Sequence, residues 1–261
     1  MALLYFACFP NLDGLVGDAG RGNEDSASPI ARTDGDKPDS PTPSRDGGTD
    51  AAAPFCATRA DAAFCVDFGD PTSLGTTYWT SNAATERPEA GTISIVADDA
   101  AASSPVVQMD LQNTVDGGCD YFQLIRRFDA PSRSVDVSFR VLTDDPAYFF
   151  NLDMKDGCSL IVSLDNPTDV VVRVQGNALD SMFLPLDLPA LGTWHDVRTL
   201  VEFPTPGSPG TLTLTWDQKA KSMTLPSGCY GKGTPRIEFG PFCMGKPLRQ
   251  RFDNILVYLS P

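Results

Sequence analysis

The chain lacks most of what helical, nucleic-acid-binding or nucleotide-binding proteins need. Its 261 residues include one His, and only five of its 34 acidic residues are Glu. The rest are Asp, which favours turns and caps over helix interiors. With 20 Lys and Arg the net charge is −14, so no basic surface is available to neutralise phosphates or to dock on an anionic membrane. No Gly-x-Gly-x-x-Gly motif or phosphate-loop Lys is present either.

What the chain does have is Asp, with 22 Gly and 22 Pro, a composition typical of β-structure with many turns. The acidity has two interpretations: solubility, or calcium binding by clustered Asp. Asp34-Gly35-Asp36 resembles a calcium loop, but the ligand spacing of an EF-hand is missing. Calcium therefore stays possible without a named site.

The first 54 residues divide into two expected segments. Residues 1–17 are expected to be the remnant of a lipoprotein signal region and an N-terminal tail. The apolar run Met1–Ala7 is followed directly by Cys8, which makes Cys8 a candidate for lipidation. The alternative is a disordered terminus with an incidental Cys. Residues 18–54 are Asp-, Gly-, Pro- and Ser-rich with one large aliphatic, Ile30, which predicts a disordered linker.

Residues 55–261 alternate apolar and polar side chains in many short runs. The clearest is Ser134–Leu142, where Val135, Val137, Phe139 and Val141 predict an inward face. Period-2 alternation predicts antiparallel strands buried on one face. Gly-, Asp- and Pro-rich turns separate the runs, so an all-β fold of two stacked antiparallel sheets or a barrel is expected. The predicted strands span 64–68, 92–98, 106–111, 119–128, 134–142, 148–154, 158–164, 169–174, 192–203, 211–216, 235–242 and 253–259.

The seven cysteines favour disulfides over zinc. Their gaps are too long for Cys-x2-4-Cys ligand pairs, and His195 is the single His. With Cys8 set apart, six remain, and six allow 15 pairings. The order of the predicted strands favours Cys56–Cys65, Cys119–Cys158 and Cys229–Cys243. Disulfides indicate an oxidising, extracytoplasmic location, either secreted or at the outer membrane.

Three motifs carry a family resemblance. They are Cys65-Val66-Asp67-Phe68-Gly69 near the start, Gly192-Thr193-Trp194-His195-Asp196-Val197-Arg198 past the middle, and Arg251-Phe252-Asp253-Asn254-Ile255-Leu256-Val257 at the end. Together they resemble the concanavalin A-like lectin/glucanase superfamily, and within it the laminin-G-like jelly-roll domains of bacterial surface lipoproteins. The resemblance covers residues 55–261 and implies an all-β, two-sheet antiparallel jelly-roll sandwich with a structural Trp194.

The strand 192–203 is expected to be a scaffold strand. Val197, Val201 and Phe203 are predicted to face one layer. Leu200 interrupts the alternation, which predicts a bulge or burial on both faces there. A site is accordingly expected in the loops and on the opposite sheet.

No catalytic arrangement stands out, and the chain is expected not to be an enzyme. Glycoside hydrolysis needs two carboxylates flanking the bond, but the superfamily's Glu-x-Asp-x-x-Glu pattern is absent and Asp136 and Asp153 are outward partners in apolar alternations. His195 is the sole candidate base for a triad, and Asp196 points to the opposite face of its strand. His195 is expected at a surface or edge.

Aromatic side chains leave a binding function open. Tyr78-Trp79 and Tyr148-Phe149-Phe150 are either sugar-stacking platforms or core, and one of the second group is expected to be exposed or under a loop. The sequence predicts a monomeric, non-catalytic binding module for a glycan or a surface protein, tethered to a membrane through Cys8. The alternatives are an accessory surface lipoprotein without a ligand, or a glycoside hydrolase relative.

Overall fold

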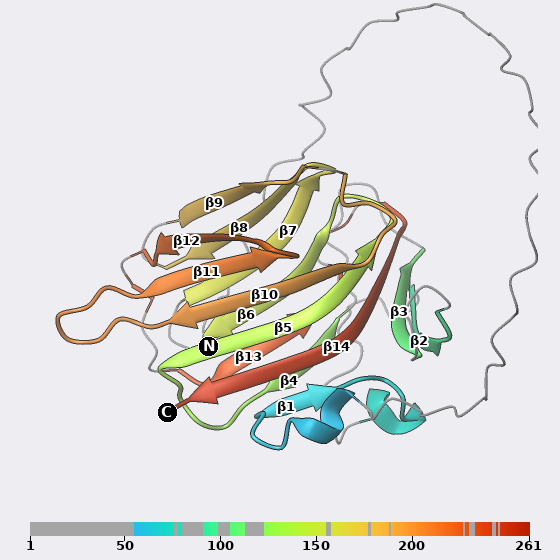
Figure 1. The fold of residues 1–261 in the computed structure, drawn as a ribbon, viewed down its shortest axis with the longest axis horizontal. Helices are drawn as coiled ribbons and strands as arrows, with labels where there is room; N and C mark the ends of the chain where they lie inside the picture. The colour runs from blue at the N-terminus through green and yellow to red at the C-terminus, as the bar shows by residue number, and fades with distance from the viewer. Residues whose placement is uncertain are drawn as a thin grey trace, which may run out of the picture. The chain divides into compact units, whose positions relative to one another are not determined.

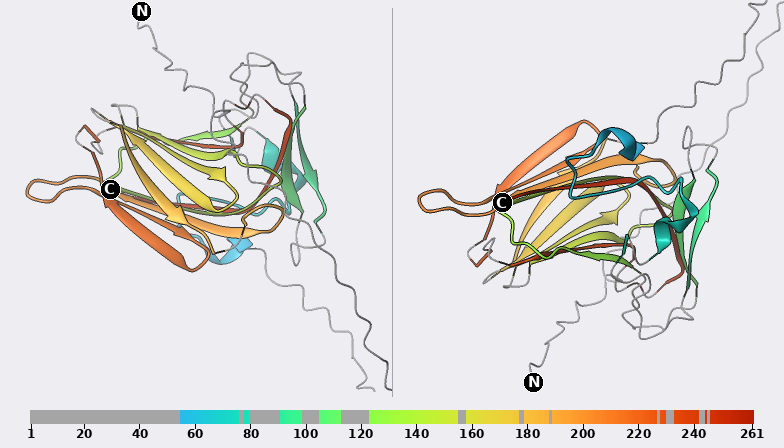
Figure 2. Two further views of the ribbon diagram at one scale, coloured as in Figure 1. Left: turned by 90° about the horizontal axis from the view of Figure 1, so that it is seen from above. Right: turned by 90° about the horizontal axis from the view of Figure 1, so that it is seen from below.

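Two antiparallel sheets stack face to face, and Figure 2 shows them as separate layers. The computed structural model describes residues 55–261 apart from 76–77, 80–90, 99–104, 113–122, 155–157, 177–178, 188, 227, 230–232, 242–243 and 245. The described residues contain strands and two short 3-10 turns, η2 (Phe55–Thr58) and η3 (Pro71–Leu74), and no α-helix. The all-β, two-sheet prediction is therefore confirmed.

The first sheet has eight strands (Figure 1). Across the sheet they run β12 (Lys219–Thr224), β11 (Thr211–Trp216), β10 (His195–Glu202), β5 (Ser134–Thr143), β14 (Leu248–Ser260), β3 (Val106–Leu111) and β2 (Gly91–Val96), and β1 (Phe64–Val66) pairs with β14. The second sheet has six: β4 (Leu124–Arg127), β13 (Pro235–Phe239), β6 (Tyr148–Met154), β7 (Cys158–Asn166), β8 (Asp169–Gln175) and β9 (Leu179–Pro185).

The core lies between the sheets and is built from the inward half of each alternation. On β5 the predicted Val135, Val137, Phe139 and Val141 are all buried. Phe139 forms the aromatic centre, with ring centroids 5.1–6.3 Å from those of four other Phe residues: Phe149, Phe150, Phe239 and Phe252. Aromatic rings at such separations bury much apolar area and add a geometry-dependent attraction.

The β10 strand confirms its predicted inward face and contradicts the expected irregularity. Val197, Val201 and the following Phe203 are buried. Leu200 pairs with Asp136 of β5 and Thr213 of β11 in an unbroken register and is half-buried on the outer face. The prediction of a bulge or two-sided burial was wrong, because an outward Leu among polar neighbours needs no change of backbone.

Register shifts lie elsewhere. They occur between β7 and β8, between β5 and β14, and in β6, where the register with β7 shifts between Tyr148 and Phe150. Such a shift lets adjacent side chains share one side of the sheet, and both Phe149 and Phe150 are buried. Trp79 is buried as well, and its indole nitrogen donates to the Ser73 carbonyl at 2.8 Å. Of the candidate sugar platforms, these three rings are core residues.

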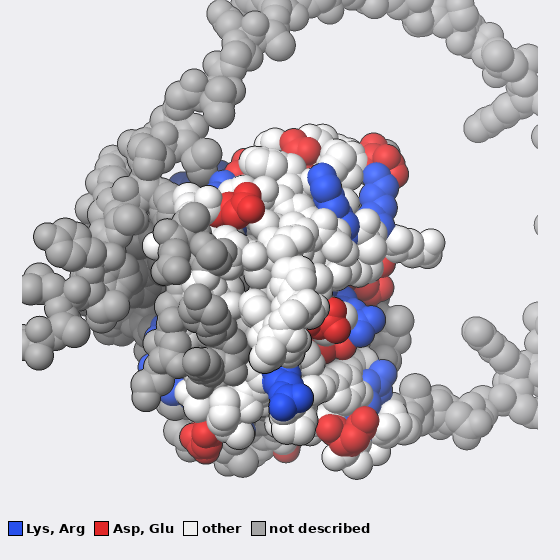
Figure 3. All heavy atoms as spheres, turned by 90° about the vertical axis from the view of Figure 1, so that its left-hand side faces the viewer, with Lys and Arg blue, Asp and Glu red and all other residues white. Residues whose placement is uncertain are grey.

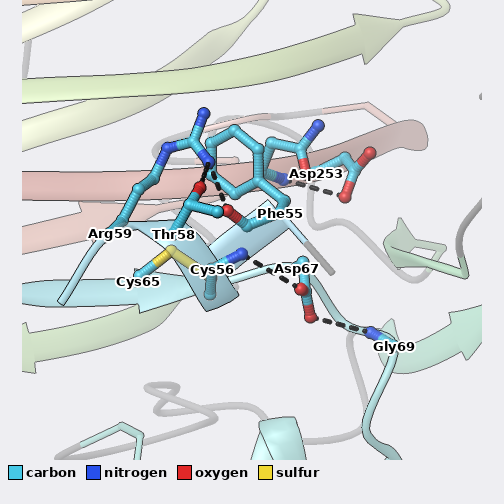
Figure 4. Close-up of a disulfide and its surroundings, with 9 residues drawn as sticks. Phe55, Cys56, Thr58, Arg59, Cys65, Asp67, Gly69 and Asp253 are labelled. Atoms are coloured by element: carbon cyan, nitrogen blue, oxygen red, sulfur yellow. Dashed lines mark hydrogen bonds between the residues drawn. A yellow bond between two sulfur atoms is a disulfide. The ribbon is translucent and has the colours of Figure 1, made fainter. Parts of the chain in front are cut away.

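One disulfide agrees with the predicted pairing and one corrects it. Cys56 bonds to Cys65, as their spacing of nine suggested (Figure 4). Cys158 bonds to Cys229 with a Cα–Cα distance of 4.7 Å, so the predicted Cys119–Cys158 and Cys229–Cys243 bonds were wrong. The reason is topological: β13 inserts beside β6, and Met154 of β6 pairs both with Pro235 of β13 and with Cys158. The chain just before β13 therefore reaches Cys158.

The Cys56–Cys65 bond belongs to a small N-terminal cluster, drawn in Figure 4. Asp67 accepts hydrogen bonds from the backbone N–H groups of Cys56 and Gly69 at 3.4 and 3.3 Å. The Arg59 guanidinium lies over the Phe55 ring, 3.7 Å from its centroid. These contacts fix η2 against β1, which pairs with the C-terminal half of β14.

Several predictions fall outside the described residues: the signal remnant 1–17 with Cys8, the linker 18–54, Cys119 and Cys243. Two strands that the sequence did not predict, β9 and β12, form an outer edge of each sheet. No helix among the described residues is long and apolar enough to cross a membrane.

Candidate functional site

The candidate site is the outer face of the six-stranded sheet, on the side of the sandwich opposite β10. The registers of its strands align outward side chains in rows that cross the whole sheet. Neighbouring strands are about 4.8 Å apart, so six strands make a face about 24 Å wide. One row, with one residue per strand, is Arg127, Arg236, Asp153, Ser159, Gln175 and Leu179.

Every member of this row is at least partly exposed. The next row is Ile125, Glu238, Asn151, Ile161, Arg173 and Ser181. Its first two members are buried and the other four are half-buried. The face therefore presents Ser, Gln, Asn and Arg side chains around a few apolar ones.

A polar network holds the middle of the face. Glu238 is 2% exposed and accepts from the Asn151 amide at 2.8 Å, and its other oxygen pairs with Arg236. Ser159 donates to the Asn151 side-chain carbonyl at 3.1 Å. Arg236 also faces Asp153 at 3.8 Å. Burial lowers the pKa of Arg236, an effect that Asp153 partly offsets. A buried carboxylate is stable only with such partners.

A second cluster lies one row further along the strands. The Arg173 guanidinium pairs with both oxygens of Asp165 and donates to Ser163 at 2.8 Å. Ser163 in turn donates to Asp165 at 2.8 Å. The guanidinium carbon lies 5.8 Å from the centroid of the half-buried Tyr148 ring. Burial raises the pKa of Tyr148 above that of an ordinary phenol, which is already protonated at neutral pH.

The apolar part of the face lies on β9. The exposed large hydrophobic side chains of the described residues are Leu179, at 57%, and Phe183, at 54%, and both point outward from this strand. They are four residues apart, or about 13 Å along a strand. Single exposed hydrophobics are ordinary, and β9 is the described strand that carries two large ones on one face.

Lysines of the other sheet cover the backbone at the free edge of β9. Lys221 donates to the Phe183 carbonyl at 2.7 Å, and Lys219 donates to the Pro185 carbonyl at 3.3 Å while pairing with Asp187. Figure 3 shows the side of the molecule on which β9 and β12 lie in Figure 1. The described surface on that side is mostly uncharged, with small, separate groups of acidic and of basic side chains. Edge lysines of this kind oppose pairing with another strand.

The sequence predicted His195 at a surface or edge. Its side chain is 13% exposed and stacks on the buried Trp216, with ring centroids 4.8 Å apart. Its Nδ1 faces Asp217 at 2.9 Å, and its Nε2 faces Thr193 Oγ1 at 2.9 Å and the Ala190 carbonyl at 3.1 Å. This outline resembles a nucleophile–base–acid triad. However, the carbonyl at Nε2 calls for a proton there, so Nε2 is poorly placed to accept one from Thr193.

The neighbouring candidate residues are structural in this geometry. Asp217 also accepts from the Asp196 backbone N–H at 3.0 Å, which fixes the end of β10. Trp194 precedes β10 and is half-buried, with the Arg140 guanidinium 5.0 Å from its ring. Asp136 and Asp153 face outward as predicted, paired with Arg198 and Arg236. No group of three or more His, Cys, Asp or Glu among the described residues could hold a metal ion.

Comparison with known proteins identifies a fold and no family. No protein-family model and no curated protein matches the sequence. Among solved structures, the alginate lyase vAL-1 from a Chlorella virus is similar with a TM-score of 0.52 and 10% identity, over 76% of this chain and 100% of the lyase. At that identity the likeness shows a jelly-roll β-sandwich fold alone.

Two further structures match with lower scores. The receptor-binding domain of botulinum neurotoxin D has a TM-score of 0.45 and 10% identity, over 77% of this chain and 49% of that one. A carbohydrate esterase of a Shiga toxin-encoding bacteriophage also has a TM-score of 0.45 and 10% identity, over 76% of this chain and 100% of the esterase. This chain thus spans about half of the receptor-binding domain that it matches.

Proposed function

We propose that this protein is a non-catalytic module that binds carbohydrate on the outer face of its six-stranded sheet. The observation that carries the proposal is the pair of exposed side chains Phe183 and Leu179 beside rows of Ser, Gln and Asn. A pyranose ring has an apolar C–H face and a rim of hydroxyls. A flat aromatic ring matches the first, and amides and hydroxyls, which both donate and accept, match the second.

The state of the ionisable groups supports binding rather than catalysis. Glu238 is buried and tied to Arg236 and Asn151, so it has no free proton or lone pair directed at solvent. Tyr148 has a raised pKa, which makes it a poor base at neutral pH. The similar fold of a polysaccharide lyase is compatible with carbohydrate as the ligand, and carries no information about this chain's chemistry.

The proposal is tested by retention on polysaccharides. The full chain is applied to a glycan array and to insoluble polysaccharides, together with Phe183→Ala, Gln175→Ala and a matched control, Thr215→Ala, on the outer face of the other sheet. Loss of one stacking ring is expected to weaken binding by roughly tenfold, about 1.4 kcal/mol. Thr215→Ala should bind like the unchanged chain. Retention that no face variant reduces, or no retention on any glycan, contradicts the proposal.

We also propose that the module is displayed outside the cytoplasm on a lipid anchor at Cys8. Two disulfides among the described residues suit an oxidising compartment. Native protein should partition into detergent and carry an acyl mass on the Cys8 peptide, and Cys8→Ser should abolish both. An unmodified Cys8 peptide from the native protein refutes the anchor and leaves the carbohydrate proposal intact.

A further inference from the structure

The charged groups of the six-stranded face bear on which carbohydrates it accepts. Its outward cations are three arginines, Arg127, Arg173 and Arg236, and its outward carboxylates are four, Asp153, Asp165, Asp169 and Glu238. Among the described residues the face is therefore not positive. The whole chain carries a net charge of −14, and the field of that charge repels polyanions before contact.

The arginines are also already occupied. Arg173 has both Asp165 oxygens and the Ser163 hydroxyl as partners. Arg236 pairs with the buried Glu238 and lies near Asp153, and Arg127 is not free either. At Arg173 and Arg236, a uronate or sulfate group would have to compete with a protein carboxylate for the guanidinium. Displacement of that carboxylate would leave a buried or half-buried charge without its partner, which is strongly unfavourable.

Beyond the face, the described residues place two β12 lysines beside the free edge of β9. Lys219 pairs with Asp187 at 2.8 Å. Lys221 donates to the Phe183 carbonyl at 2.7 Å, at the edge of β9. Neither lies in the rows that cross the sheet, so they do not give the face a line of free cations to follow a charged polymer.

The outward side chains of the face that are not in ion pairs are mostly uncharged. Gln175 is exposed, Ser159 and Ser181 are half-buried, and Phe183 and Leu179 supply apolar contact. From this balance we infer that the ligand is a neutral glycan rather than an acidic polysaccharide. The inference rests on the proposed carbohydrate binding and adds the ligand's charge class to it.

The test uses one polymer backbone in two charge states. Alginate, and alginate whose carboxyl groups have been reduced to alcohols, are compared as ligands of the full chain by affinity electrophoresis and titration calorimetry, with a neutral glucan and a mannan beside them. At least one neutral polymer is expected to bind tenfold or more tightly than alginate. Added salt is expected to change that affinity by less than twofold, because no ion pair with the ligand forms.

A charge-releasing variant sharpens the comparison. Asp165→Asn removes the carboxylate partner of Arg173 while keeping the shape of the side chain. It is expected to gain at least threefold in affinity for alginate, with a dependence on salt that the unchanged chain lacks. The control is Lys246→Ala, which breaks the ion pair of Lys246 with Asp145. This variant should gain no affinity for alginate. Circular dichroism confirms that each variant folds.

The outcomes separate the inference from the proposal beneath it. Alginate binding as tightly as the neutral polymers, with binding that weakens as salt rises and that Phe183→Ala reduces, overturns the inference and upholds carbohydrate binding. No binding to any polymer in either charge state overturns both. Neutral binding without a gain in Asp165→Asn also counts against the inference, because it means that pairing of Arg173 is not what excludes acidic glycans.

Discussion

The Cys158–Cys229 disulfide should stabilise the fold more than Cys56–Cys65, because it closes a far longer loop. The sequence separations are 71 and 9 residues. In the chain-entropy treatment, closing 71 residues contributes about 4.4 kcal/mol at 25 °C and closing nine contributes about 2.6 kcal/mol. The double variant Cys158→Ala/Cys229→Ala is thus expected to lose about 1.8 kcal/mol more than Cys56→Ala/Cys65→Ala.

Guanidinium unfolding of the two double variants measures this difference. Alanine is chosen because Cys158 and Cys229 are buried, where a Ser hydroxyl would need a partner. Lost packing could mimic the expected loss of stability, so the denaturant slope is the second readout. A released 71-residue loop lets the unfolded chain expand, which should raise that slope more than release of the short loop. Equal losses with equal slopes, or a larger loss at Cys56–Cys65, would refute the reasoning.

Three further predictions follow from buried or edge groups. Thr199 is fully buried, and its hydroxyl has no hydrogen-bond partner. Thr199→Val should therefore stabilise the protein by about 1 kcal/mol, measured by urea unfolding. A loss of stability would mean that the hydroxyl is hydrogen-bonded in the folded protein. Burial raises the pKa of Tyr148, so the buried neutral phenol stabilises the fold below about pH 10, and this stabilisation is lost as pH rises through the folded-state pKa. Ultraviolet titration should show one phenol that ionises later than the others, and Tyr148→Phe should remove it. Lys221→Ala uncovers the Phe183 carbonyl at the edge of β9 and should raise self-association in sedimentation velocity, whereas an unchanged monomer would show that the edge needs no cover.

The sequence predicted the interior of both sheets well, because a buried strand must show its apolar face to the core. The Val-x-Val-x-Phe-x-Val run of β5 and the valines of β10 could be placed from alternation alone. The same signal fails at edges. β12, Lys219–Thr224, is exposed along most of its length and has no apolar side to reveal it.

The candidate site was missed for a related reason. On β9, Met182 and Leu184 are buried while Leu179 and Phe183 face solvent, so four apolar side chains occupy both faces and the alternation disappears. The exposed apolar residues that make the strand hard to recognise are those proposed to contact the ligand. The expectation that a site would lie on the sheet opposite β10 remains a prediction, now with named residues.

The disulfide partners could not be read from the order of strands along the chain. Cys158 and Cys229 meet because β13 pairs with β6, a contact between segments about 80 residues apart in sequence. Nothing local in the sequence specifies that pairing. The Cys56–Cys65 bond was predictable because it closes within one short segment.

That short disulfide has a mechanical consequence. A pull on the chain preceding Phe55 reaches Cys56 and passes through sulfur to Cys65, the middle residue of β1. The residues between the two cysteines, which would extend by about 30 Å as a free strand, carry no load. Cys65 pairs with Leu256 of β14, and β14 is bonded to β5 on its other side. Tension entering at the N-terminal end is therefore delivered to the centre of the eight-stranded sheet, and reduction of one bond would turn a stiff attachment into a compliant one.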